Sequence, residues 1–201
     1  MGVPENELTP KVRAALVGLM EEVGRLRQEL EHTRKRIGYL EQLADQDSLV
    51  PVVNRRAFVR ELSRMMSFAE RYAVSSSILF FDLNKMKAIN DTYGHAAGDA
   101  SLSHVAGVLL ENVRESDVVG RLGGDEFGVI LAQADEAQAN EKATLLATAV
   151  EQRPLVWEAN EIRLSVSFGT YTFRGGEDTG HALHAADQAM YRHKKSAAGG
   201  S

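Results

Sequence analysis

Apolar residues repeat at alternating spacings of three and four near the start of the chain, between Val12 and Ala44. Read as heptads, the a positions are Leu16, Val23, Leu30, Ile37 and Ala44, and the d positions are Val12, Leu19, Leu26, Thr33 and Leu40. A stripe this narrow fits the seam between two helices better than a broad globular core. The pattern predicts a coiled-coil helix over residues 8–46, with a single amphipathic helix packed on its own domain as the alternative.

Charged residues flank this stripe with a regular pairing of signs. In a parallel dimer each g residue faces the next e residue of the partner helix. The three such pairs are Glu22 with Arg27, Glu29 with Arg34, and Arg36 with Glu41, and all are opposite in sign. Each exposed pair contributes only ~0.5 kcal/mol, so the pairs set orientation rather than stability. They predict a parallel, in-register homodimer.

The chain from residue 47 to 196 has the mixed pattern of a globular domain. Apolar residues at helical spacing occupy 58–69, 102–113, 145–150 and 183–190, whereas short strand-type runs occupy 77–83, 118–122, 127–131 and 163–173. The turn Gly123-Gly124 between two of these runs is a strong hairpin signal. Together they predict an α/β fold, an α+β sandwich with a mixed central sheet flanked by helices.

Carboxylates stand at the ends of two predicted strands. Asp82 ends a buried-type run, and Asp125 and Glu126 directly follow Gly123 and Gly124. If the hairpin pairs beside the first strand, these acidic groups converge at one edge of the sheet. Mg²⁺ prefers such oxygen ligands and completes its shell with water and substrate phosphates. An acidic turn after two glycines is, on its own, more often a solvated hairpin tip.

Composition narrows the function classes. The 201 residues are 44% hydrophobic and 25% charged, which supports a packed core. A net charge of −5 argues against a broad nucleic-acid interface. The absence of cysteine excludes disulfides and thiolate metal sites and favours the cytoplasm. No apolar run in this chain approaches the roughly 20 residues of a membrane span. We expect a soluble cytoplasmic protein.

Several short sequence motifs, in a fixed order along the chain, indicate a specific protein family. Residues 122–127 read Leu-Gly-Gly-Asp-Glu-Phe, and further segments match at 54–58, 82–87, 89–95, 98–99, 165–169 and 186–191. These segments resemble the GGDEF family of diguanylate cyclases, bacterial signalling enzymes that join two GTP molecules into cyclic di-GMP and release two pyrophosphates. The resemblance covers about residues 47–194 and implies a fold like that of nucleotidyl cyclases and polymerase palm domains.

The resemblance implies a metal centre and a base. Asp82, Asp125 and the Leu83 backbone carbonyl would bind Mg²⁺, or Mn²⁺ in its place. The metal would lower the pKa of the GTP 3′-hydroxyl and orient the α-phosphate for in-line attack. Asp125 or Glu126 would take the proton, and the sequence does not choose between them.

The resemblance also implies groups that hold the substrate. Asn90 and Asp99 would bind the guanine edge, Gly124 would let the backbone approach the nucleotide, and Lys87 and Lys194 would hold the β- and γ-phosphates. Taken alone, Asn90 and Asp99 also fit turn formation and helix N-capping, and the lysines fit plain surface charges.

Arg114 and Asp117 resemble the RxxD inhibitory site at which many diguanylate cyclases bind cyclic di-GMP. An arginine can grip a phosphate and an aspartate can accept from a base. The alternative for this short motif is a surface ion pair.

The expected reaction needs two copies of the domain. One site holds one GTP, whereas each 3′-hydroxyl must attack the α-phosphate of the other nucleotide. A coiled-coil homodimer would raise the effective concentration of one site near the other. An upstream sensor could act by changing how the helices pack.

Several departures from the family pattern favour a second interpretation. Pro51 replaces a usual glycine, Asn84 replaces a common aspartate, and Ala197 and Ala198 stand where Gly-Arg is usual. The rival function is therefore a degenerate domain that binds GTP or cyclic di-GMP as a receptor without turnover. A coiled coil with an inert cap explains none of the site residues, and Asp99 argues against a hybrid cyclase that makes cyclic GMP-AMP.

Overall fold

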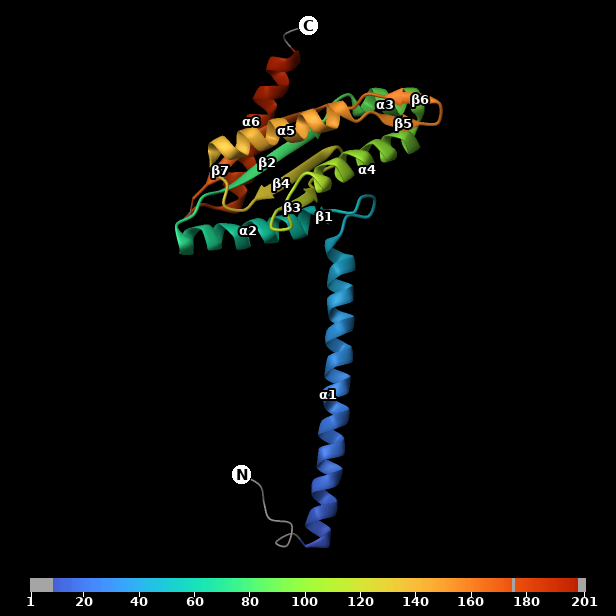
Figure 1. The fold of residues 1–201 in the computed structure, drawn as a ribbon, viewed down its shortest axis with the longest axis vertical. Helices are drawn as coiled ribbons and strands as arrows, with labels where there is room; N and C mark the ends of the chain where they lie inside the picture. The colour runs from blue at the N-terminus through green and yellow to red at the C-terminus, as the bar shows by residue number, and fades with distance from the viewer. Residues whose placement is uncertain (1–8, 175, 199–201) are drawn as a thin grey trace. The chain divides into compact units, whose positions relative to one another are not determined.

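The structure is a computed structural model, which describes residues 9–174 and 176–198 (Figure 1). It divides into two compact units at the boundary between Ala44 and Asp45.

The first unit consists of the long helix α1 (Pro10–Asp45). Proline suits the first position of a helix because no intrahelical partner exists for an N–H there. Thr9 lies at the helix start, where its side-chain oxygen accepts from Val12 N at 3.4 Å. Residues of the predicted seam are largely exposed in the single chain, for example Leu16 at 42%, Leu30 at 52% and Leu19 at 61%.

Charged residues on α1 are already paired within the chain. Arg25 binds Glu22 at 2.5 Å and Glu29 at 3.0 Å, at the i,i+3 and i,i+4 spacings that bring helical side chains together. The pairing of these glutamates with a second chain stays a prediction. Leu8, where the predicted helix begins, and the Glu41 side chain lie outside the described residues.

The second unit is built on a five-stranded sheet of order β1-β3-β4-β2-β7. Its strands are β1 (Val53–Asn54), β2 (Ser76–Leu83), β3 (Val118–Arg121), β4 (Glu126–Leu131) and β7 (Val166–Phe173). β1 and β3 are parallel, and the other neighbours are antiparallel. The predicted mixed sheet is therefore confirmed.

Helices cover both faces of this sheet (Figure 1). They are α2 (Arg55–Tyr72), α3 (Met86–Tyr93), α4 (His95–Glu111), α5 (Glu136–Gln152) and α6 (Thr179–Ala198). Successive residues of the central strand β2 point to opposite faces. Leu79 and Phe81 accordingly join a core with α4 and α5, whereas Ile78 and Phe80 join a second core with α2 and α6.

Short elements are where the sequence prediction differs from the structure. β1, α3 and the hairpin of β5 (Leu155–Trp157) and β6 (Asn160–Ile162) were not predicted, because they are too short to show a periodic pattern. The strand predicted over 163–173 begins only at Val166. Helix N-capping by Asp99 is wrong, since Asp99 lies inside α4 and Gly94 is its N-cap.

Within the described residues, no helix combines the length and the apolar character that crossing a membrane requires.

Candidate active site

The register between β2 and β4 brings the acidic residues together. Asp82 is the cross-strand partner of Glu126, and Leu83 N donates to Asp125 O at 3.0 Å. Directly opposed residues share a face of the sheet, with Cβ atoms about 4.5–5.5 Å apart. The expected convergence of Asp82 with the hairpin tip is therefore what the fold produces.

Two arginines hold the hairpin turn by its backbone carbonyls. Arg55 Nη1 donates to Leu122 O at 2.9 Å, and Arg121 Nη2 donates to Gly124 O at 2.7 Å. Arg121 Nη1 also binds Asp47 Oδ1 at 3.1 Å, and only 15% of the Arg121 side chain is exposed. The turn before Asp125 is thus fixed from both sides of Gly123. Neither arginine was predicted from the sequence as a site residue, although Arg55 lies in the segment 54–58 that matches the family.

The segment around Pro51 explains how proline is accepted there. Val52 N donates to Val50 O at 2.8 Å, which closes a three-residue turn centred on Pro51. The restricted φ of proline suits the centre of an inverse γ-turn, and no N–H is needed from it. Asp47 Oδ1 accepts from Leu49 N and Val50 N at 3.0 and 3.1 Å and fixes the same loop. Replacing glycine by proline is therefore compatible with this backbone.

Asn84, where an aspartate is common, joins β2 to the chain around β7. Its Nδ2 donates to Ser165 Oγ at 3.2 Å, and its Oδ1 accepts from Ser167 Oγ at 2.8 Å. Both the nitrogen and the oxygen of the Asn84 amide therefore form hydrogen bonds to serines. Asn84 therefore acts as a structural link here, and its oxygen does not stand free for a metal.

Lys194 reaches the candidate metal ligand Asp82. Its Nζ lies 2.5 Å from Asp82 Oδ1, and the side chains are 45% and 11% exposed, respectively. α6 thus delivers an ammonium group to the end of β2. The family resemblance implies a role toward phosphate for Lys194, and it did not indicate this ion pair.

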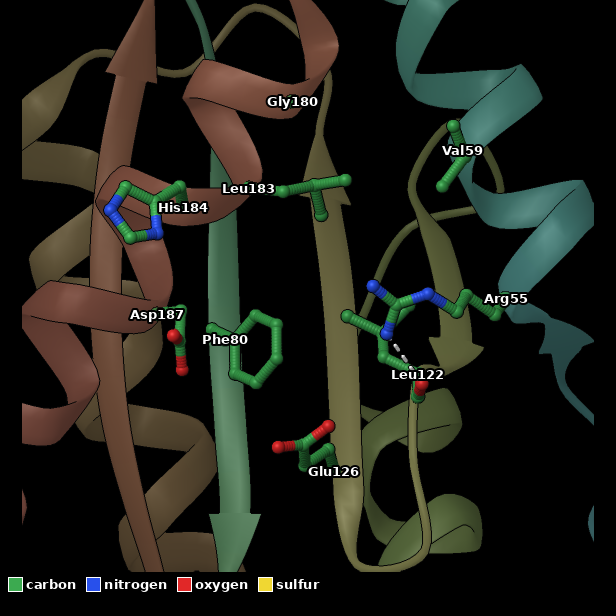
Figure 2. Close-up of a pocket in the computed structure, with 9 residues that line it drawn as sticks. All are labelled: Arg55, Val59, Phe80, Leu122, Glu126, Gly180, Leu183, His184 and Asp187. Atoms are coloured by element: carbon green, nitrogen blue, oxygen red, sulfur yellow. Dashed lines mark hydrogen bonds between the residues drawn. The ribbon is translucent and has the colours of Figure 1, made fainter.

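A pocket of about 340 Å³ opens beside these carboxylates, between α2, α6 and the sheet (Figure 2). Glu126 and Asp187 point into it from the sheet and from α6, and Arg55 approaches from the side of α2. Burial raises the pKa of the Glu126 carboxyl above its ordinary value. The negative charges of Asp125, Asp187 and Asp82 raise it further, whereas the Arg55 guanidinium lowers it.

The described residues fit part of a magnesium shell. No group of three or more histidine, cysteine or acidic side chains among them surrounds a common metal position. Mg²⁺ in nucleotide enzymes commonly takes one or two carboxylates and draws its other ligands from water and phosphate. The Asp82 carboxylate already holds a cation, the Lys194 ammonium, at 2.5 Å. Asp82, with Asp125 beside it, is therefore suitable for a metal that arrives with a nucleotide.

Asn90 presents a buried acceptor at the junction of α3 and α4. Its Oδ1 is buried and has no hydrogen-bond partner in the described part of the chain. A Cβ on Gly98 would lie 2.0 Å from this oxygen, so only glycine leaves room for it. Buried acceptors without partners are rare and costly. A ligand N–H could satisfy this oxygen, and the exposed side chain of Asp99 lies next to Gly98.

Two other predicted substrate residues, Lys87 and Gly124, have less defined surroundings. Lys87 is exposed on the first turn of α3, and Gly124 is exposed in the hairpin turn. The helix α6 continues past Lys194 to Ala198, but the side chains of Ala197 and Ala198 lie outside the described residues.

Arg114 and Asp117 lie apart from the carboxylates, at a second pocket of about 270 Å³. Residues of α5, including Gln138 and Lys142, line the same pocket. Asp117 accepts from Arg114 N at 3.0 Å and from Ala132 N at 3.2 Å, which fixes the loop before β3. The Arg114 side chain is exposed. The pair thus combines a braced carboxylate with an arginine beside a cavity.

Comparison with known proteins adds independent information. A family model described as "Diguanylate cyclase, GGDEF domain" matches residues 44–199. The probable diguanylate cyclase DgcE of Escherichia coli is 34% identical over 173 residues, which cover 86% of this chain and 16% of DgcE. The diguanylate cyclase TpbB of Pseudomonas aeruginosa is 36% identical over 192 residues, covering 92% of this chain and 44% of TpbB. The chain thus spans less than half of either relative.

Among solved structures, the coiled coil and GGDEF domain of DgcB from Caulobacter crescentus, in complex with c-di-GMP, superposes with a TM-score of 0.73. Its sequence is 28% identical, and the match covers 92% of this chain and 94% of that one.

The space at Gly98 yields a test of the Asn90 site. In Gly98→Ala the new Cβ would clash only with the ends of the Asn90 and Met86 side chains, which can move. We expect thermal stability to change little, whereas affinity for 3′-deoxy-GTP with Mg²⁺ should fall about tenfold, as for one lost hydrogen bond to a buried group. Calorimetric titration measures this. Gly107→Ala, on the same helix and with open space around it, is the control. Equal affinities in both variants would remove Asn90 from the site.

Proposed function

The chain belongs to the GGDEF-domain family of diguanylate cyclases, and from that premise we propose that it joins two molecules of GTP into cyclic di-GMP. The observation that carries this proposal is the pairing of Asp82 with Glu126, which gathers Asp82, Asp125 and Glu126 at one edge of the sheet. The family match alone would also fit a domain that had lost its acidic residues. We further propose a cytoplasmic location, where GTP is available.

The proposed chemistry is an in-line displacement at the α-phosphorus. The 3′-oxygen of one GTP forms a bond to the α-phosphorus of the other, the bond to the β-phosphate breaks, and pyrophosphate leaves. Asp82, Asp125 and the Leu83 carbonyl would hold Mg²⁺, or Mn²⁺. When bound there, this metal would supply charge neutralisation at the phosphates and acidify the 3′-hydroxyl. The hydroxyl proton passes to Asp125 or Glu126, and burial beside other carboxylates raises the pKa of Glu126 above its ordinary value, which suits a group that accepts a proton.

The remaining site residues hold and orient GTP in this proposal. The unpartnered Asn90 oxygen accepts from the guanine edge, and Asp99 accepts from the same edge beside it. Gly124 has no side chain to obstruct the nucleotide, and the ammonium groups of Lys87 and Lys194 attract the β- and γ-phosphates. Orientation matters because a correctly placed nucleophile and phosphorus avoid much of the entropic barrier.

A second copy of the chain completes the reaction. We propose that α1 forms a parallel homodimeric coiled coil, which keeps two GTP-loaded domains at a high effective concentration. Support comes from the exposed heptad residues of α1 and from the likeness to the DgcB structure, which by its description includes a coiled coil. An upstream sensor acting through these helices would control how often the two sites meet.

A receptor without turnover is the second candidate. Ala198 stands where the family usually has an arginine, so one cation expected near the phosphates is missing from the sequence. Such a domain would still bind GTP or cyclic di-GMP through Asn90 and Arg114.

We also propose that cyclic di-GMP binds at Arg114 and Asp117 and inhibits the enzyme. The pocket beside them offers room for a base, the Arg114 guanidinium can bind a phosphate in two-pronged fashion, and the braced Asp117 carboxylate can accept from guanine. Because this pocket is separate from the carboxylate cluster, bound cyclic di-GMP would inhibit by keeping the two GTP-loaded domains of the homodimer from approaching each other.

Turnover distinguishes the enzyme from the receptor. Purified chain incubated with GTP and Mg²⁺ should yield cyclic di-GMP on chromatography. Asp125→Ala should lower the rate by at least about a thousandfold, because both a metal ligand and a candidate base are lost. Glu70→Ala, at an exposed position on α2 outside the segments that match the family, is the control. Nucleotide that is bound by the unchanged chain but never converted would support the receptor instead.

Feedback is tested by adding cyclic di-GMP to the same assay. Arg114→Ala should require about tenfold more cyclic di-GMP for half-inhibition, since a charge-assisted bond to phosphate is lost. Arg163→Ala removes an exposed arginine elsewhere and should leave inhibition unchanged. Identical inhibition curves for both variants would exclude Arg114 from an inhibitory site.

A further inference from the structure

Lys194 occupies a position that its proposed role toward phosphate does not explain. Residues 182, 186 and 190 of α6 are buried against the sheet, and Lys194 continues this spacing of four on the same side of the helix. Its ammonium therefore extends along the sheet to the end of β2. There it lies 2.5 Å from Asp82 Oδ1, although the two residues are 112 positions apart in sequence.

The surroundings of Asp82 account for this contact. Asp82 is 8% exposed, and its cross-strand partner is a second acidic residue, Glu126, which Asp125 directly precedes. A buried carboxylate among other carboxylates needs a counter-charge, because burial and like charges both disfavour the ionised form. The Lys194 ammonium supplies this counter-charge where the proposed function places a metal ion.

The Lys194 ammonium takes one of the two oxygens of the Asp82 carboxylate and places a positive charge beside any metal ion that binds this carboxylate. A divalent cation approaching alone would meet a positive charge already bound to its ligand. A nucleoside triphosphate removes this competition, since its phosphate oxygens offer the ammonium an alternative partner and offer the metal further ligands.

We propose that Lys194 is an internal counter-ion that closes the metal site until a nucleoside triphosphate arrives, and then moves from Asp82 to the phosphates as the metal takes its place. This inference rests on the proposed function for the metal-binding role of Asp82. It makes metal and nucleotide binding mutually dependent, because each favours the same open arrangement of Lys194. The site then avoids holding a metal that has no substrate.

Binding of Mn²⁺ alone to the whole 201-residue chain, measured by electron paramagnetic resonance, tests this proposal without turnover. Lys194→Met should bind Mn²⁺ at least about tenfold more tightly than the unchanged chain, because the competing charge is removed. Lys194→Arg keeps a cation at this position and should bind weakly. Arg192→Met is the control for net charge, since Arg192 is exposed and lies roughly on the opposite side of α6.

The double variant Asp82→Asn/Lys194→Met shows whether Mn²⁺ binds at Asp82. In this double variant the gain in Mn²⁺ affinity seen with Lys194→Met should disappear. A Lys194→Met chain that binds Mn²⁺ no more tightly than the unchanged chain, or a gain that survives loss of Asp82, overturns the proposal.

A second titration, with Mn²⁺ and 3′-deoxy-GTP, separates this failure from failure of the proposed function. If Asp82→Asn still abolishes binding of the metal–nucleotide complex, Asp82 is a metal ligand and only the counter-ion role is wrong. If it does not, the proposed metal site is wrong as well.

Discussion

The antiparallel register between β2 and β4 is the constraint on which the rest of the site depends. It sets Asp82 opposite Glu126 and Leu83 beside Asp125. A shift of one residue would turn the side chains of a strand to the opposite face. The register is well specified because β2 is buried along its whole length and divides its apolar side chains between two cores. Core packing thereby determines where the acidic groups meet.

Concentrating carboxylates at one edge creates an electrostatic cost that the surrounding cations offset. Arg55 and Arg121 hold the hairpin by the carbonyls of Leu122 and Gly124, and Lys194 binds Asp82. The first two contacts fix the backbone that carries Asp125. The contact of Lys194 with Asp82 joins a long, flexible side chain to a proposed metal ligand. Lys194 can therefore leave Asp82 when substrate binds. The site thus combines a rigid turn with one exchangeable charge.

Much of this arrangement follows from sequence patterns, and the remainder depends on contacts between distant segments. Strand runs and a Gly-Gly turn predicted the mixed sheet from local periodicity. The convergence of Asp82 with the hairpin tip was predicted only on the condition that the hairpin pairs beside the strand that Asp82 ends, and the register of β2 with β4 meets that condition. Nothing in the local pattern could show that Lys194 reaches Asp82 or that Gly98 leaves room for Asn90. The accommodation of Pro51 likewise required the observed turn from Val50 to Val52.

We propose that two such sites, brought together by α1, make one cyclic product. Initial rates of cyclic di-GMP formation per chain, measured over a wide range of protein concentration, test it most directly. Leu30→Asp places a charge at an a position that is 52% exposed in the single chain, and Gln28→Asp places the same charge outside the seam. We expect dilution to leave the per-chain rate of Gln28→Asp unchanged, whereas that of Leu30→Asp should fall in proportion to concentration. Rates for the two variants that respond identically to dilution would contradict it.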